Sequence, residues 1–252
     1  MTIALYDEYL QRVNALVARI AAEERDSIMR AAGAVADRVA DDRLVNVIGP
    51  GGHSSMGAEE IFYRAGGLAC VNALLDDGFL LAHGALRSMA VERTPGYGRT
   101  VLQNANLADG DILIIVNAYG VNASTIDCAI YAREIGVTTI GVTSVELQRA
   151  LPKDHPARHP SQQDLADLVD ITIDTKVPVG DALMEVEGIH ERVGAVSTFA
   201  NSFALNALIL EAIAELSRRN FDPPIWRSAN SPGGDAANQD AIARYRPRIK
   251  RL

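Results

Sequence analysis

Leu44-Val45-Asn46-Val47-Ile48, followed directly by Gly49-Pro50-Gly51-Gly52, is the stretch of sequence that decides the fold. A short apolar run that stops at glycines is typical of a buried strand that enters a tight turn. Residues 54–62 then begin with two serines, carry acids in their early turns and become apolar, as helix N-termini do. The stretch therefore predicts a strand, a glycine-rich turn and a helix.

The same order of strand, turn and helix returns downstream. Residues 112–116 predict a strand, residues 119–122 a turn and residues 123–135 a helix, and residues 137–142 predict a further strong strand. Two weaker strand candidates are residues 68–74 and 169–173. Strands that alternate with helices imply parallel pairing through right-handed crossovers. We therefore expect an α/β fold, a three-layer αβα sandwich around a doubly wound, mostly parallel five-stranded sheet of the flavodoxin-like Rossmannoid type.

The sequence on both sides of this core has helical periodicity. Apolar residues recur at helical spacing over residues 6–39, which predicts one long N-terminal helix or two joined ones, and again over residues 193–216. Residues 151–163, which include His155 and His159, and residues 177–188 are expected to form surface loops. We expect one domain over residues 1–252, made of a helical segment (1–42), an αβα core (43–216) and a Pro/Gly/Asn-rich tail (217–252).

Composition and charge exclude several classes of protein. The chain has 252 residues, of which 48% are hydrophobic, and a formal net charge of -8, which disfavours a nucleic-acid or anionic-membrane surface. Cys70 and Cys128 lie in apolar surroundings without metal-ligand spacing, as ordinary buried thiols in a reducing compartment do. The start of the chain has no signal-peptide pattern, and no run of about 18 apolar residues occurs. We expect a cytoplasmic protein without a cofactor or an obligatory metal.

The candidate ligand-binding residues follow the predicted strands. Ligands of open parallel sheets bind beyond the carboxyl ends of the strands, where helix N-termini favour anions. The residues expected there are Gly52, Ser54 and Ser55 after the first strand, Asn117, Tyr119, Gly120 and Asn122 after the second well-marked strand, and Thr143 and Ser144 after the next. Each segment also has a purely structural interpretation as a turn followed by a helix cap. Motif by motif, therefore, binding and structural roles both remain open.

Several well-known motifs are absent from the sequence. The glycine-rich turn lacks the G-x-G-x-x-G spacing of a dinucleotide fingerprint, and no Gly-Lys-Ser/Thr follows it as in a phosphate-binding Walker loop. Gly52-His53-Ser54 lacks the second glycine of a hydrolase nucleophile elbow. No H-x-x-x-H or C-x-x-C pair places two zinc ligands on one face.

The order of the three segments resembles the SIS (sugar isomerase) domain, a family of phosphosugar isomerases and phosphosugar-binding proteins. The resemblance covers roughly residues 44–216. It is carried by Gly51-Gly52-His53-Ser54, by Asp111-Ile112-Leu113-Ile114 through Gly120, by Ile140-Gly141-Val142-Thr143-Ser144, and by Glu191 through Thr198. The chain is also similar to a bacterial subgroup of sugar isomerase-like SIS proteins related to phosphoheptose isomerases, through Arg64-Ala65-Gly66-Gly67-Leu68 and Ser228 through Asp235. Where the family has two phosphate-gripping serines, this chain has Asn117 and Tyr119, so a neutral or sulfonated sugar remains an alternative to a phosphosugar.

The resemblance implies aldose–ketose isomerisation, in which a base moves a proton between C1 and C2 through an enediol. It implies that Glu191 is the base and that Ser197 opens the last helix at the site. Glu60 is the second candidate base. His53 is expected to polarise a carbonyl or to help bind an anion, and His190 to serve the opening of the sugar ring. Either acid could instead be a first-turn residue that complements a helix dipole. The alternatives are a phosphosugar lyase, etherase or deaminase on the same fold, and a non-catalytic sugar-phosphate sensor.

The resemblance also implies an assembly. The expected partners are a small sugar or sugar phosphate and further copies of this chain, as a dimer or tetramer with sites near the subunit interface. The apolar stripe of the N-terminal helix supports this expectation because it needs a surface to pack against. No nucleic-acid or membrane partner is expected.

Overall fold

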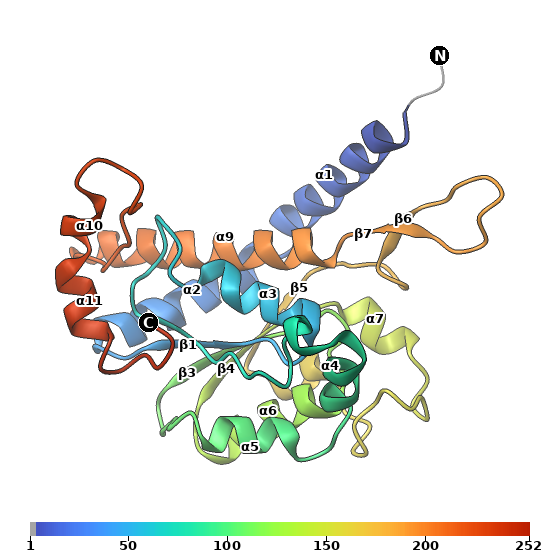
Figure 1. The fold of residues 1–252 in the computed structure, drawn as a ribbon, viewed down its shortest axis with the longest axis horizontal. Coiled ribbons are helices and arrows are strands. Elements are labelled where there is room, and N and C mark those ends of the chain that lie inside the picture. Colours follow the sequence, from blue (N-terminus) through green and yellow to red (C-terminus); the bar gives the residue numbers. More distant parts are fainter. Residues whose placement is uncertain (1–3) are drawn as a thin grey trace.

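A parallel sheet of five strands forms the centre of the computed structural model, which describes residues 4–252 (Figure 1). Its strand order is β2-β1-β3-β4-β5, and every neighbouring pair is parallel. The strands are β1 (Val45–Ile48), β2 (Val71–Ala73), β3 (Ile112–Val116), β4 (Thr138–Thr143) and β5 (Ile171–Asp174). The predicted doubly wound αβα sandwich is confirmed.

Alternate residues of β3 pack into the two halves of the hydrophobic core. Ile112, Ile114 and Val116 belong to one apolar cluster and Leu113 and Ile115 to the other, and all five are buried. Successive side chains of a strand point to opposite faces, so a strand covered on both sides reads as a continuous apolar run.

Helices cover both faces of the sheet (Figure 1). The first face packs against α2 (Arg25–Ala40), α3 (Gly52–Ile61) and α9 (Ser197–Arg218). The second face packs against α5 (Tyr97–Gln103), α6 (Ala123–Glu134) and α8 (Leu165–Leu168). Helix α9 is long and apolar enough to cross a membrane, but its buried residues join the core cluster beside α2 and α3, as those of a core helix do.

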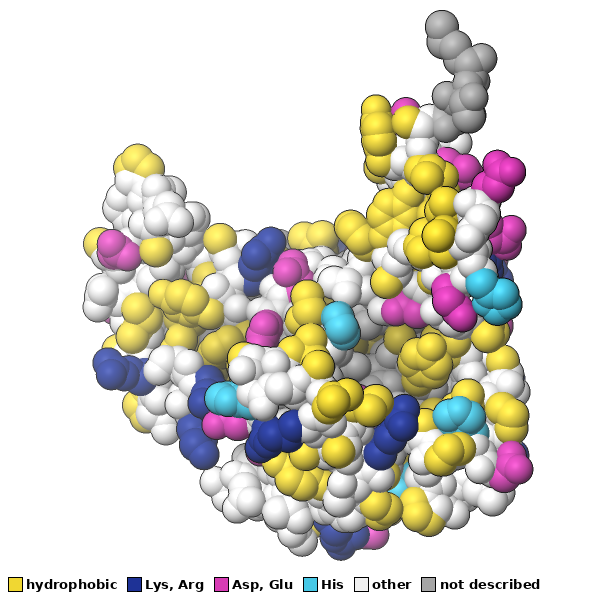
Figure 2. Space-filling view, turned by 45° about the vertical axis from the view of Figure 1, so that its right-hand side comes forward, with side chains coloured by type: hydrophobic (Ala, Val, Ile, Leu, Met, Phe, Trp, Pro, Cys, Tyr) yellow, Lys and Arg dark blue, Asp and Glu magenta, His cyan; other side chains and the backbone are white. Residues whose placement is uncertain are grey.

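The N-terminal helical segment consists of two helices, α1 (Leu5–Glu23) and α2, that meet at Glu24. The Glu24 carboxylate, largely buried, binds Lys176 Nζ at 2.7 Å and so attaches the junction to the end of β5. The second half of α1 buries its apolar side chains near α9, whereas its first turns project from the body (Figure 1). Figure 2 shows hydrophobic side chains gathered around this projecting end, where Leu5, Tyr6 and Leu10 are exposed.

The prediction that the last helix begins at residue 193 is wrong, because a short strand precedes the helix. Val193–Ala195 forms β7, which pairs antiparallel with β6 (Ala182–Met184) inside the segment expected to be a loop. Gly194 has φ +78°, outside the helical region, and Asp181 accepts the backbone N–H groups of Val196 and Ser197. The carboxylate therefore caps α9, and the helix begins at Ser197.

The connections and the tail contain further helical elements. The elements are η1 (Leu81–His83), α4 (Ala85–Glu92), α7 (Val145–Ala150), α10 (Gly234–Ala237) and α11 (Gln239–Tyr245). The tail is more ordered than its Pro/Gly/Asn-rich composition predicts, because Tyr245 and Ile249 are buried in the first core cluster. The single-domain organisation stays a prediction.

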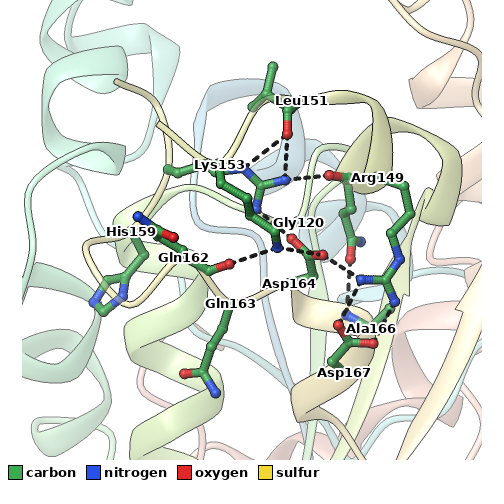
Figure 3. Close-up of polar contacts among 12 residues, drawn as sticks. Gly120, Arg149, Leu151, Lys153, His159, Gln162, Gln163, Asp164, Ala166 and Asp167 are labelled. Carbon is green, nitrogen blue, oxygen red and sulfur yellow. Dashed lines mark hydrogen bonds and ion pairs between the residues drawn. The ribbon is translucent and has the colours of Figure 1, made fainter. Parts of the chain in front are cut away.

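The loop over residues 151–163, expected at the surface, is held by a buried ion pair to Asp164. Figure 3 labels Asp164 together with Arg149 and Lys153, which bind the same carboxylate. Arg158 Nη1 lies 2.5 Å from Asp164 Oδ1, and both side chains are almost inaccessible to solvent. Arg149 and Lys153 reach the other carboxylate oxygen from the surface. Next to Asp164, the Leu165 N–H donates to the Gly120 carbonyl at 2.8 Å, so the network fixes the loop that follows β3. His159, also expected at the surface, is only partly exposed and lies 3.3 Å from Asp127.

Replacing Arg158 tests the importance of this pair. Arg158→Ala leaves the Asp164 carboxylate buried with weaker partners, and we expect it to lower the free energy of unfolding by about 3 kcal/mol in urea denaturation. Arg149→Ala is the matched control, because Arg149 binds the same carboxylate from an exposed position and should cost at most about 1 kcal/mol. An equal loss of unfolding free energy in the two variants would contradict a special role for the buried Arg158.

Candidate active site

A cavity of about 330 Å³ lies at the carboxyl edge of the sheet, beyond the ends of β1 and β3. The first turn of α3, helix α4, the loop after β3 and the start of α9 form its walls. Its lining residues are Gly52, His53, Ser54, Leu81, Ala85, Ser88, Met89, Glu92, Asn117, Ala118, Tyr119, Asn122, Asp181, Ser197 and Asn201. The position is the one at which open parallel sheets bind ligands.

The glycine-rich turn brings the N-terminus of α3 against the cavity. Gly51 caps this helix with φ +135°, a backbone conformation that side chains rarely allow. A Cβ atom at this position would also lie 2.3 Å from Glu92 Oε2. Glycine is therefore needed at residue 51 both for the backbone angle and for the close approach of the Glu92 carboxyl group.

The loop after β3 forms the opposite wall and is tied to the glycine-rich turn. Asn117 Nδ2 donates to the Pro50 carbonyl at 3.0 Å, and Asn117 Oδ1 accepts the Gly120 N–H at 2.8 Å. Gly120 has φ +59°, and the next turn ends at Asn122, which caps α6. One amide side chain thus fixes the spacing between the starts of α3 and α6.

Glu92, at the end of α4, is the acid whose ionisation the cavity perturbs most. Burial raises the pKa of its carboxyl group from 4.5 to about 7, and the charge of Arg93 opposes this only in part. Asn122 Nδ2 lies 3.5 Å from Glu92 Oε1, a long hydrogen bond, and no ion pair joins Glu92 to a cation within residues 4–252. A carboxyl group with a pKa near neutrality can accept or donate a proton at physiological pH.

Asp181 is the second acid of the lining, and its oxygens are engaged by the start of α9. Oδ1 accepts the Val196 and Ser197 N–H groups, and Oδ2 accepts the Ser197 hydroxyl at 2.7 Å. Burial, together with the negative charge of Asp181, raises the pKa of Tyr119, so this phenol stays protonated and can donate to a ligand. Asp181 therefore positions Ser197. Tyr119, in turn, remains a hydrogen-bond donor.

The structure brings together residues from every chain segment expected at the site except the one after β4. The predicted residues that line the cavity are Gly52, His53, Ser54, Asn117, Tyr119, Asn122 and Ser197. They meet because the carboxyl ends of β1 and β3, which are paired neighbours, lie side by side.

Four predicted ligand-binding residues lie outside the cavity lining and have structural bonds instead. The Ser55 hydroxyl donates to the carbonyls of Gly49 and Gly51, and Gly120 shapes the turn through its backbone. Gln148 Nε2 donates to the Thr143 hydroxyl at 2.6 Å, and Ser144 caps α7 while donating to the Val177 carbonyl. These hydroxyls are engaged within the chain, and their ligand-binding role stays a prediction.

Three of the four predicted catalytic residues are not brought to the cavity of their own chain. Glu60 lies in a separate surface hollow and accepts a hydrogen bond from Asn206 Nδ2 at 3.1 Å. His190 and Glu191 lie between β6 and β7, on the hairpin that projects from the body in Figure 1, and their side chains are 97% and 88% exposed. His53 lines the cavity. The catalytic role of Glu191 stays a prediction that requires the cavity of another copy.

Sequence reasoning missed Glu92 and Asp181. Glu92 ends a short helix whose eight residues carry no motif, and a glutamate there looks like any solvated residue. The connection between β2 and β3 is nevertheless long for one crossover, and such extra length at the carboxyl edge was the available signal. Asp181 stood in a segment expected to be a loop.

Neither a thiol nor a metal cluster contributes to this region. Burial raises the pKa of Cys70 to about 12 and that of Cys128 well above its ordinary value, so both stay protonated thiols. Within residues 4–252 no group of three or more His, Cys, Asp or Glu side chains could hold a metal ion. The expectation that no metal is required stays a prediction.

The raised pKa of Glu92 predicts a pH-dependent stability difference. The folded protein holds this proton up to about pH 7, whereas the unfolded chain releases it near 4.5, so the free energy of unfolding falls as the pH rises through this interval. Glu92→Gln removes that loss. Allowing for partial exposure, we expect the variant to be more stable than the parent by about 2 kcal/mol above neutral pH and equally stable at about pH 4 in denaturant titrations. A pH-independent difference would show that Glu92 titrates normally.

Comparison with known proteins identifies the class. A model of the SIS domain matches residues 8–144, more than half of the chain. The chain therefore belongs to the SIS domain family.

Individual relatives match over the whole chain. A UPF0309 protein of Brucella anthropi is 38% identical over 252 residues, covering 100% of this chain and 99% of that protein. A UPF0309 protein of Geobacillus thermodenitrificans is 33% identical over 245 residues, covering 97% of this chain and 96% of that protein.

Solved structures share the fold at low sequence identity. The phosphoheptose isomerase of Neisseria gonorrhoeae has a TM-score of 0.51 at 17% identity, covering 84% of this chain and 99% of that one. The NanR protein of Vibrio vulnificus, complexed with ManNAc-6P, has a TM-score of 0.50 at 13% identity, covering 98% of this chain and 70% of that one. These likenesses agree with the observed sheet order and layers.

Proposed function

We propose that this SIS protein binds a sugar or sugar phosphate in the cavity at the carboxyl edge of the sheet and interconverts its aldose and ketose forms. The observation that supports the proposal is the Glu92 carboxyl group, which faces a cavity of about 330 Å³ and has a pKa of about 7. An enediol mechanism needs one group that accepts a carbon-bound proton and returns it to the neighbouring carbon, and such a group works best when its pKa lies near the working pH.

The residues around Glu92 supply the rest of the chemistry. Glu92 as carboxylate takes the proton from C2 of the aldose, and the electron pair of the broken C–H bond forms the C1–C2 double bond of the enediol. A donor completes the step by protonating the O1 oxygen, and His53 and Tyr119 are the donors that share the cavity. Return of the proton from Glu92 to C1, with loss of the O2 proton, gives the ketose.

The proposal changes the base from Glu191 to Glu92 for a physical reason. Glu191 is almost fully exposed on a hairpin and lies outside the cavity lining of its own chain, whereas Glu92 belongs to that lining. In a homodimer or tetramer the hairpin could enter the cavity of a neighbouring copy. The exposed Leu5, Tyr6 and Leu10 support such an assembly because they offer an apolar surface for another chain.

A cytoplasmic location also remains part of the proposal.

Solvent exchange tests the function directly. We expect proton NMR in deuterated water, with a panel of aldoses, ketoses and their phosphates, to show loss of a C1 or C2 proton signal together with formation of an aldose–ketose mixture. Elimination products or released ammonia would indicate a lyase or deaminase instead. Binding without any exchange, seen as a thermal shift, would indicate a sensor and contradict the isomerase.

Variants of the two acids then identify the base. We expect Glu92→Gln to lower the exchange rate at least about 100-fold while the substrate still raises the melting temperature. In the parent, kcat/KM should rise with pH and reach half its maximum near pH 7, where Glu92 loses its proton. Glu59→Gln, on the exposed side of α3, is the control of equal charge. Loss of exchange in Glu191→Gln with full activity in Glu92→Gln would instead assign the base to the hairpin.

A further inference from the structure

A second cavity, of about 270 Å³, lies beside β2, the strand at one end of the strand order. Its walls are β2 and the chain that follows it, helix α5 with the turn after it, and the last residues of the tail. Among residues 4–252, its lining has no residue in common with that of the candidate active site. It is therefore a separate place at which a ligand could bind.

Positive charge gathers in this cavity although the chain as a whole is acidic. The lining contains three basic side chains of the tail, Arg248, Lys250 and Arg251, and one acid, Asp76, whereas the formal net charge of the chain is -8. Arg248 is engaged by Asp42, outside the lining, at 2.9 Å. A concave surface with a surplus of positive charge favours an anionic ligand.

The other two basic residues have donors to spare. Arg251 Nη2 donates to the Leu75 carbonyl at 2.8 Å and lies 3.2 Å from Asp77, which fixes the guanidinium group against the chain after β2. Within residues 4–252 its Nε and Nη1 groups donate no hydrogen bond, and Lys250 has neither an ion pair nor a side-chain hydrogen bond. Holding the tail in place therefore accounts for part of Arg251 and for none of Lys250.

Amide oxygens in the same lining are left without partners. Asn72, 8% exposed on β2, donates from Nδ2 to Oδ1 of Asn46 at 2.9 Å, and Asn46 Nδ2 donates in turn to the Ile112 carbonyl. This chain of bonds orients the Asn72 amide, and its Oδ1 atom accepts no hydrogen bond within residues 4–252. Asn104, after α5, likewise uses Nδ2 to bind the Thr100 carbonyl. Such free acceptors match hydroxyl groups of a ligand.

We propose that this cavity is a second ligand site, which binds a small phosphate monoester whose body carries hydroxyl groups. The phosphate binds to Lys250 and Arg251, because guanidinium and ammonium groups form charge-assisted hydrogen bonds with phosphate oxygens. A hydroxyl group of the body donates to Asn72. A volume of about 270 Å³ lies near the lower end of small-molecule sites, at about 300 Å³, so the ligand is small.

The probes are inorganic phosphate, ribose 5-phosphate and AMP, each titrated at low ionic strength and followed by the side-chain amide NMR signals of Asn72 and Asn104. We expect these signals to shift saturably, and a monoester to bind at least about tenfold more tightly than inorganic phosphate, because its hydroxyl groups add hydrogen bonds. The tighter of the two monoesters identifies the body as a sugar or a nucleoside. Lys250→Gln should weaken monoester binding about fivefold, since it removes a charge without breaking a contact within the chain.

Arg246→Gln is the matched control, because Arg246 is an exposed residue of the same tail and lies outside the lining. It should keep the parental affinity. An equal loss in both variants would reduce the effect to long-range attraction and overturn the proposal. Unchanged amide signals, or a monoester that binds no more tightly than inorganic phosphate, would overturn it as well. None of these results depends on turnover, so a failure here leaves the isomerase proposal standing, and the reverse also holds.

Discussion

Strand β3 lies at the centre of the sheet, hydrogen-bonded to β1 on one side and to β4 on the other, and its five residues are buried on both faces. This double burial constrains everything else. Because both faces must be covered, helices pack on each side, and because the strands are parallel, all their carboxyl ends meet at one edge. The cavity exists because the paired ends of β1 and β3 deliver two loops to the same place, and the Asn117 amide holds those loops at a fixed separation.

Acidic residues determine the character of that edge. Elsewhere in the protein the buried Asp164 is neutralised by Arg158, whereas the lining residues around the two acids of the cavity, all within residues 4–252, include no Lys or Arg. Asp181 is stabilised by the N–H groups at the start of α9. Within residues 4–252, Glu92 has one long hydrogen bond, and burial raises its pKa to about 7. The same fold thus holds one acid as a structural cap and another with a pKa near neutrality.

The fold could be predicted from the sequence because its signals are local. Continuous apolar runs mark the strands, and glycines and helix-capping residues mark the turns between Ile48 and Ser54 and between Val116 and Ala123. The hairpin and the start of α9 could not be predicted, because they depend on Asp181, which caps a helix that begins about fifteen residues later in the chain. Of the site, the residues that follow strands could be predicted. Glu92 could not, because its pKa arises from burial by other segments. Glu191 has the family pattern but lies exposed on the hairpin, and its role stays a prediction.

The two cysteines illustrate how deeply the core excludes solvent reagents. Cys70 is part of the first apolar cluster and Cys128 of the second, and both remain protonated thiols within the folded chain. Alkylating probes, which react with exposed thiolates, should therefore leave the native protein unlabelled. A single cysteine introduced on the projecting hairpin or at the exposed end of α1 would then carry a fluorophore or spin label at one defined place without removal of the chain's own thiols.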